Sequence, residues 1–258
     1  MAQYIVYACG AVPAGGLSDR LKGLISCYGL SVALGCEFIA DWTFPYPLQQ
    51  VLQPNEVDWL PRPITGTLKN CFVMDNENLE WFKPVLSDTK NCLKEEIIVI
   101  RTNLNFLSYL NMQDKFEEYF KKLFKKPKFS LPIGPKTLGV CARFGGIQAN
   151  WADSDFNRQL SFEDVIEKTQ TIFKQGNYDN LFVCSDSTKF IETASTHLDF
   201  MCTAGASEHM DRQQCSFEGF KKSFDDFFCL RECADIISTK GEFAITAALS
   251  NGKKVIQI

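Results

Sequence analysis

The sequence predicts an α/β protein made of two Rossmann-like domains, and three observations lead to this fold class. Continuous apolar, β-branched segments such as Tyr4–Cys9 recur along the chain and are typical of strands buried in a parallel sheet. Segments with helical spacing of apolar residues alternate with these strands in both halves. Prolines at 127, 132 and 135 mark a linker, so we expect domains at 1–130 and 131–258.

The first half begins with a strand–loop–helix–strand unit. Apolar residues recur near helical spacing over 21–33, with Ser18 expected as the N-cap and Gly35 as the end of the helix. The expected elements are a strand at 4–9, a glycine-rich turn at 10–16, this helix, a strand at 36–42, a proline-rich irregular stretch at 45–63, strands at 71–74 and 97–101, and a helix at 113–125.

The second half repeats the alternation. Ser161 and Asp164 form a capping box, and Gly176 follows the end of that helix. The expected elements are strands at 137–142, 181–185, 200–203, 234–237 and 253–258, and helices at 161–175, 189–194, 220–233 and 242–250. In parallel sheets of this kind, binding loops follow the carboxyl ends of the strands.

Charge and composition limit the possible ligands. Lysine and arginine number 27 against 31 aspartates and glutamates, a net charge of −4, so no nucleic-acid partner is expected. The cationic stretch 121–128 is interpreted as the end of a helix, where positive side chains complement the dipole.

Only His197 and His209 are imidazoles, and no C-x-x-C pair occurs, so no metal is expected. Asp153-Ser-Asp155 resembles a metal-binding D-x-D, but no apolar strand precedes it, which favours a loop or a helix start.

The cysteines and the N-terminal segment indicate the compartment. Eleven cysteines are spread along the chain, several inside apolar stretches such as 181–184, so most are expected to be reduced and buried. The first apolar stretch has no basic residues before it and is broken by glycines, unlike a signal peptide. The uncharged window 23–36 is shorter than the roughly 20 residues that span a bilayer. We therefore expect no transmembrane segment and a cytoplasmic protein, or one at the cytosolic face of a membrane.

The glycine-rich turn places Gly15 and Gly16 at a helix start, where backbone amides can meet a phosphate or a sugar. It lacks the lysine of a P-loop and the spacing of a dinucleotide fingerprint, so a tight structural turn is an equally good interpretation. Asp19 and Arg20 follow and are expected to face the strand ends.

A second candidate is Arg143, which ends a buried strand and precedes two glycines. The planar guanidinium suits a diphosphate, and the glycines allow a ligand to come close. A structural salt bridge is the alternative.

Two more polar loops are predicted at the same edge of the second sheet. Asp186 and Ser187 end one strand, and the loop 238–243 ends another. Hydroxyls and amides at a helix start suit phosphate, and a carboxylate accepts hydrogen bonds from a base or a ribose. The alternatives are N-caps at Ser187 and Thr239 and a solvated lysine at 240.

Taken together, these segments resemble a known family. Residues 15–26 and 38–42 look like the N-terminal signature of GDP-fucose-dependent fucosyltransferases related to the rhizobial nodulation α-1,6-fucosyltransferase and the protein O-fucosyltransferases. The later pieces occur in the family's order, namely the strand ends at 139–146 and 185–187, His209-Met-Asp211, and the loop at 238–243. The resemblance implies a compact GT-B-like glycosyltransferase architecture, GDP-fucose as the donor substrate, inversion at the anomeric carbon and no required metal.

The resemblance also implies roles for single residues. Arg143 would bind the β-phosphate and stabilise the charge on departing GDP, and Asp19 would position the acceptor hydroxyl as a base. The expected donor-binding residues are Gly15, Gly16, Arg143, Asp186, Ser187, Ser238, Thr239, Gly241 and Phe243. The chain departs from the family's pattern at Cys141, where histidine is common, and at Glu242, where serine is common.

The acceptor is expected to meet the aromatic residues of the first half. Trp42 and Tyr46 would stack on its sugars, and aromatic packing under the proline-rich loop is the equally good alternative. The predicted function is metal-independent transfer of fucose from GDP-fucose to a glycan or glycoconjugate. A non-catalytic glycan- or nucleotide-binding relative is the alternative, and the missing glycine fingerprint disfavours a nicotinamide-dependent oxidoreductase.

Overall fold

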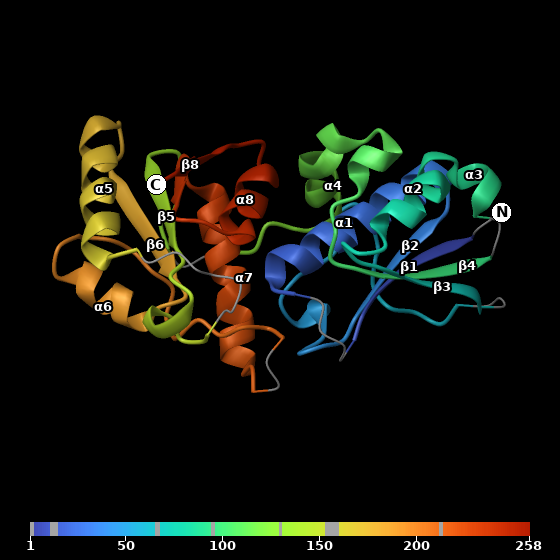
Figure 1. Cartoon of the computed structure of the whole chain (residues 1–258), viewed down its shortest axis with the longest axis horizontal. Helices are drawn as coiled ribbons and strands as arrows, with labels where there is room; N and C mark the ends of the chain where they lie inside the picture. Colours follow the sequence, from blue (N-terminus) through green and yellow to red (C-terminus); the bar gives the residue numbers. More distant parts are fainter. Residues whose placement is uncertain are drawn as a thin grey trace. The chain divides into compact units, whose positions relative to one another are not determined.

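The computed structural model describes residues 3–10, 15–64, 68–93, 96–128, 131–152, 160–211 and 214–258. Contacts divide the chain into two compact units, Met1–Lys126 and Pro127–Ile258, and each contains one four-stranded sheet of parallel strands (Figure 1). The predicted α/β class with two Rossmann-like domains is therefore confirmed.

The first unit has the strand order β2-β1-β4-β3, with β1 at Tyr4–Cys9, β2 at Glu37–Trp42, β3 at Leu68–Met74 and β4 at Ile97–Thr102. Its helical segments are α1 at Leu17–Leu34, η1 at Leu48–Gln50, α2 at Leu79–Ser87, α3 at Thr89–Cys92, η2 at Leu107–Leu110, η3 at Gln113–Lys115 and α4 at Phe116–Leu123. Helix α1 packs closely on the sheet at Gly23, where a Cβ atom would lie 2.2 Å from the carbonyl oxygen of Thr102.

The sheet of the first unit carries its helices on one face. Helices α1, α2, α3 and α4 lie on the same side of the strands, and a coil segment runs along the other side (Figure 1). On that other face, Ile64 packs against Val6, Ile39 and Ile97. The strands are thus buried on one side by helices and on the other, in part, by a strap of chain.

The second unit has the strand order β6-β5-β7-β8, with β5 at Thr137–Ala142, β6 at Asn180–Ser185, β7 at Asp235–Ser238 and β8 at Val255–Gln257. Its helical segments are η4 at Gly146–Gln148, α5 at Phe162–Gln175, α6 at Thr188–Ser195, α7 at Phe217–Glu232 and α8 at Glu242–Leu249.

Both faces of this second sheet are covered. Val140 of β5 belongs to a core cluster with Val165 of α5 and Phe190 of α6 on one face. On the opposite face, α7 comes so close that a Cβ atom at Gly139 would lie 2.8 Å from a methyl carbon of Leu230. All six residues of β5 are buried.

Several sequence predictions of local structure need correction. Helices α2 and α3 were not predicted, because Pro84 and many polar residues interrupt the apolar spacing there. The strand expected at 200–203 is only an isolated bridge between Phe182 and Met201. Helix α1 is capped by Gly16 rather than Ser18, while Gly35 ends it in the left-handed conformation as predicted.

The cysteines are free thiols, as expected, and most are buried. The exposed ones are Cys71, Cys92 and Cys202. Within the described ranges, no helix combines the length and the apolar character that a membrane crossing requires.

Candidate functional site

The candidate site lies at the carboxyl ends of β5 and β7, where Arg143 leaves the sheet. The backbone N–H of Arg143 donates to Thr239 Oγ1 at 2.8 Å, and the same hydroxyl donates to the Arg143 carbonyl at 3.0 Å. Thr239 directly follows β7, which pairs with β5. One side chain therefore fixes both polar backbone groups of Arg143.

Asp186 fixes the backbone of the two residues that follow Arg143. It directly follows β6, and its carboxylate accepts from the N–H groups of Phe144 at 2.9 Å and Gly145 at 3.1 Å. Burial raises the pKa of this carboxyl above its usual value, while the two amides and the positive charge of Arg143 oppose the shift. Arg143 is thus fixed between two loops, and Asp186 acts on the loop rather than on a ligand.

The backbone at Gly241 lies close to the side chain of Arg143. It caps the N-terminus of α8 with φ 126° and ψ 153°, a conformation that L residues rarely adopt, and a Cβ atom there would lie 3.2 Å from Cδ of Arg143. Ser238 precedes this loop, and its buried Oγ has no hydrogen-bond partner among the residues that the structure describes. Phe243 lies on α8 and packs edge-on against Phe227 of α7, with ring centroids 5.6 Å apart.

This arrangement suits an anion with more than one oxygen. A guanidinium and the N-terminal amides of α8 lie close together at the carboxyl ends of β5 and β7, and each can donate a hydrogen bond. Glu242 stands in the first turn of α8 and adds a negative charge beside them.

Ser187 is a helix cap, which was the alternative interpretation. Its Oγ accepts from the N–H of Phe190 at 3.1 Å and starts α6, and the residue is only 1% exposed. The structure thus shows Ser187 as an N-cap, and its contact with the donor stays a prediction.

In the first unit, Gly15 and Gly16 lead into α1. Gly15 has φ 77°, and the N–H of Gly16 donates to Asp19 Oδ2 at 3.3 Å. The other carboxylate oxygen of Asp19 lies 3.0 Å from Lys22 Nζ, and the side chain is 30% exposed. Asp19 is therefore accessible, although it also caps its own helix. Residues 11–14 of the glycine-rich turn and the Asp153-Ser-Asp155 motif lie outside the described residues.

Arg20 faces the carboxyl ends of β1 and β2, where its guanidinium makes contacts within the fold. It is fully buried and donates to the carbonyl oxygens of Gly15 and Phe44 and to Cys9 Sγ. Its guanidinium carbon lies 5.5 Å from the ring centroid of Trp42, which is also fully buried.

The burial of Trp42 corrects its predicted acceptor role. Its ring packs against Tyr7 and Arg20 and offers no face to a sugar, so core packing, the alternative, is what the structure shows. Tyr46 is half-buried, and its acceptor role stays a prediction.

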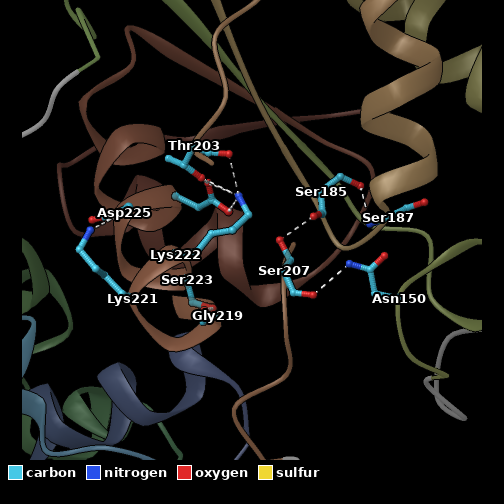
Figure 2. Close-up of polar contacts among 11 residues, drawn as sticks. Asn150, Ser185, Ser187, Thr203, Ser207, Gly219, Lys221, Lys222, Ser223 and Asp225 are labelled. Atoms are coloured by element: carbon cyan, nitrogen blue, oxygen red, sulfur yellow. Dashed lines mark hydrogen bonds and ion pairs between the residues drawn. The ribbon is translucent and has the colours of Figure 1, made fainter. Parts of the chain in front are cut away.

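Sequence reasoning missed a set of polar contacts that join the loops of the second unit. Asn150 donates through Nδ2 to the Ser207 carbonyl at 2.9 Å (Figure 2). Its Oδ1 accepts from the N–H of Thr188 at 3.0 Å. The Ser207 hydroxyl donates to the Ser185 carbonyl at 2.8 Å. Single asparagines and serines in loops carry no pattern, so no sequence signal identifies these contacts.

Comparison with known proteins finds solved structures of similar architecture. No protein-family profile and no curated protein matches the sequence. Among solved structures, NodZ α-1,6-fucosyltransferase soaked with GDP-fucose is similar over 96% of this chain and 92% of its own, with a TM-score of 0.59 at 15% identity. Fucosyltransferase NodZ from Bradyrhizobium is similar over the same shares, with a TM-score of 0.56 at 15% identity.

This chain has the GT-B fold of NodZ. The resemblance to the fucosyltransferases inferred from the sequence is therefore confirmed as a structural similarity over nearly the full chain. At 15% identity the likeness establishes the GT-B fold alone. Within the described ranges, no group of three or more histidine, cysteine, aspartate or glutamate side chains is placed to hold a metal ion.

Proposed function

We propose that this chain is an inverting, metal-independent glycosyltransferase that transfers fucose from GDP-fucose to a glycan or glycoconjugate in the cytoplasm. The observation that carries the proposal is the fixed position of Arg143, held by Thr239 and Asp186 at the N-terminus of α8. The GT-B fold shared with NodZ supports the same class of reaction.

In the proposed reaction, the acceptor hydroxyl oxygen bonds to the anomeric carbon of fucose while the bond from that carbon to the β-phosphate oxygen breaks. GDP departs with the electron pair, and Arg143 and the amides of α8 stabilise the developing negative charge. The proton of the acceptor hydroxyl passes to Asp19, which we propose as the base because its carboxylate is accessible. Gly15 and Gly16 bring backbone amides to the same end of the first sheet.

Calorimetry with GDP, UDP and NAD tests the donor part of the proposal. GDP should bind, and Arg143→Ala should weaken binding by about a hundredfold, the loss of a charge-assisted bidentate contact. Arg143→Lys keeps the positive charge but loses the planar guanidinium that can donate two parallel hydrogen bonds. Its affinity for GDP should therefore lie between those of wild type and Arg143→Ala. Chelator should leave binding and transfer unchanged. GDP binding that is absent, or indifferent to both variants, would overturn the proposal.

A second candidate is a non-catalytic relative that binds a nucleotide or a glycan, and Glu242 is the observation that favours it. Its carboxylate stands in the first turn of α8, where it opposes a bound diphosphate. If the protein binds GDP but neither hydrolyses GDP-fucose nor transfers it to any member of a broad acceptor panel, this candidate replaces the enzyme. Recovery of transfer in Glu242→Ser would identify Glu242 as the cause.

A further inference from the structure

The open face of the first sheet carries two charges that the catalytic proposal does not use. Side chains at paired positions of parallel strands lie on the same face. Asp41 pairs with Ala8, and Val73 pairs with Arg101. Arg101 stands one position beyond the pair Tyr7↔Ile100, which places it beside Ala8. The row Asp41–Ala8–Arg101–Val73 therefore crosses the sheet at its carboxyl end, which we call the open row.

The open row lies on the face without helices. Alternation along β1 puts Ala8 on the same face as Val6, which the strap covers at Ile64. The strap does not bury the open row, because Asp41, Arg101 and Val73 are all exposed, Val73 by 53%. Strands of parallel sheets are normally buried on both faces, so the exposed charges at the carboxyl ends of the edge strand β2 and the inner strand β4 need an explanation.

Within the described part of the chain, neither Asp41 nor Arg101 makes a hydrogen bond or an ion pair through its side chain. With β1 between their strands, their Cα atoms are about 10 Å apart, which is two strand spacings. The guanidinium reaches toward the end of β1, where a Cβ atom at Gly10 would lie 4.0 Å from Arg101 Nη2. Small residues, Ala8 and Gly10, thus stand between the two charges.

We propose that the open row binds the neutral carbohydrate acceptor. A carboxylate accepts hydrogen bonds from sugar hydroxyls, a guanidinium donates to them, and the pair adds no net charge that would favour an anion. The apolar surface of Val73 suits the C–H face of a sugar ring, and the small residues between the charges leave the strand end accessible. The inference rests on the proposed function and names the acceptor surface that the burial of Trp42 left unassigned.

The test measures binding of the full chain to an immobilised panel of neutral oligosaccharides, with GDP affinity measured on the same samples. Wild type should bind at least one glycan, and Asp41→Asn and Arg101→Gln should each weaken that binding about tenfold or more while GDP affinity stays unchanged. Glu37→Gln and Arg62→Gln are the matched controls, because both are exposed charged residues of the same unit that pair with each other away from the open row.

The outcomes separate the two proposals. If no glycan binds, or if both open-row variants bind like wild type, the inference is wrong even where GDP binds tightly. If the open-row variants lose glycan binding but the protein never binds GDP, the glycan surface stands and the donor proposal fails.

Discussion

The two sheets of this protein have the same number of parallel strands but differ in where they keep charge. In the second unit helices cover both faces, and Lys222 and Asp226 of α7 are buried together. In the first unit helices cover one face, and Asp41 and Arg101 are exposed on the other. A covered sheet can hold a fixed anion site because its polar groups are preorganised, whereas an open face leaves charges available to a ligand rich in hydroxyls.

The largest expected effect comes from breaking the buried pair of the second unit. Lys222 Nζ lies 3.0 Å from Asp226 Oδ2 and 2.6 Å from Thr203 Oγ1, and burial raises the pKa of the Asp226 carboxyl while the lysine opposes the shift (Figure 2). Lys222→Met leaves that carboxyl buried without its cation, so urea unfolding should show a loss of about 3–5 kcal/mol.

Lys221→Met is the matched control on the same helix. Lys221 pairs with Asp225 at the surface, so its loss should cost about 0–1 kcal/mol. If both lysine variants lose the same free energy of unfolding, burial does not make the Lys222–Asp226 pair more important for stability than the surface pair.

Next in size is the close packing of helix on sheet. At Gly23 an added Cβ meets the backbone oxygen of Thr102, and at Gly139 it meets the mobile end of Leu230. Alanine at either position should cost about 1–3 kcal/mol, with Gly23→Ala at the upper end because a backbone atom has less room to move. Gly134→Ala, which meets nothing within 4 Å, is the control in thermal melts. The reverse order would contradict the assigned contacts.

An effect of similar size is expected from Asp186→Asn, because one of the two backbone N–H groups that now donate to the carboxylate would face the side-chain NH₂ of asparagine. The cost should be about 1–3 kcal/mol, with weaker GDP binding because the Arg143 loop loosens. The sign of the pH dependence follows from the raised pKa. The folded state holds the proton more tightly than the unfolded state, so the stability of wild type relative to Asp186→Asn should fall as pH rises from the ordinary aspartate pKa through the raised value, and then level off. A rise over that range, measured by urea unfolding, would contradict the burial of Asp186.

The smallest change in stability is expected for Asp19→Asn in the first unit. It weakens an exposed ion pair with Lys22 and keeps a cap for Gly16, so the cost should stay below about 1 kcal/mol. If Asp19 is the base, the transfer rate should nevertheless fall by a factor of about 100 or more with GDP affinity unchanged. An unchanged rate would remove Asp19 from the mechanism.

The parts of the fold that depend on local pattern were predicted from the sequence. Buried strands such as Tyr4–Cys9 and the cap at Ser161 each carry their signal in a few consecutive residues. Helix α2 was missed because Pro84 breaks its apolar spacing, and the segment at 200–203 has strand composition but only one paired residue.

The sequence placed Arg143, Asp186 and Thr239 at neighbouring strand ends, and the structure shows how their backbone and side chains contact one another. The arginine at a strand end identified Arg143, and the neighbouring strand ends identified Asp186 and Thr239. That these two act on the backbone around Arg143 depends on strand order, which the sequence does not encode locally. Trp42 was misassigned for the same reason, since an aromatic residue at a strand end is buried or exposed according to which segment covers it.

The contacts of Arg20 have a consequence for local opening. Its guanidinium joins the end of β1 at Cys9, the glycine-rich turn at Gly15 and the chain after β2 at Phe44. The N–H groups of Thr43 and Phe44 in turn donate to the Cys9 carbonyl. Because one buried side chain ties these segments, they should open as a single cooperative unit, and in native-state hydrogen exchange their amides should share one protection free energy.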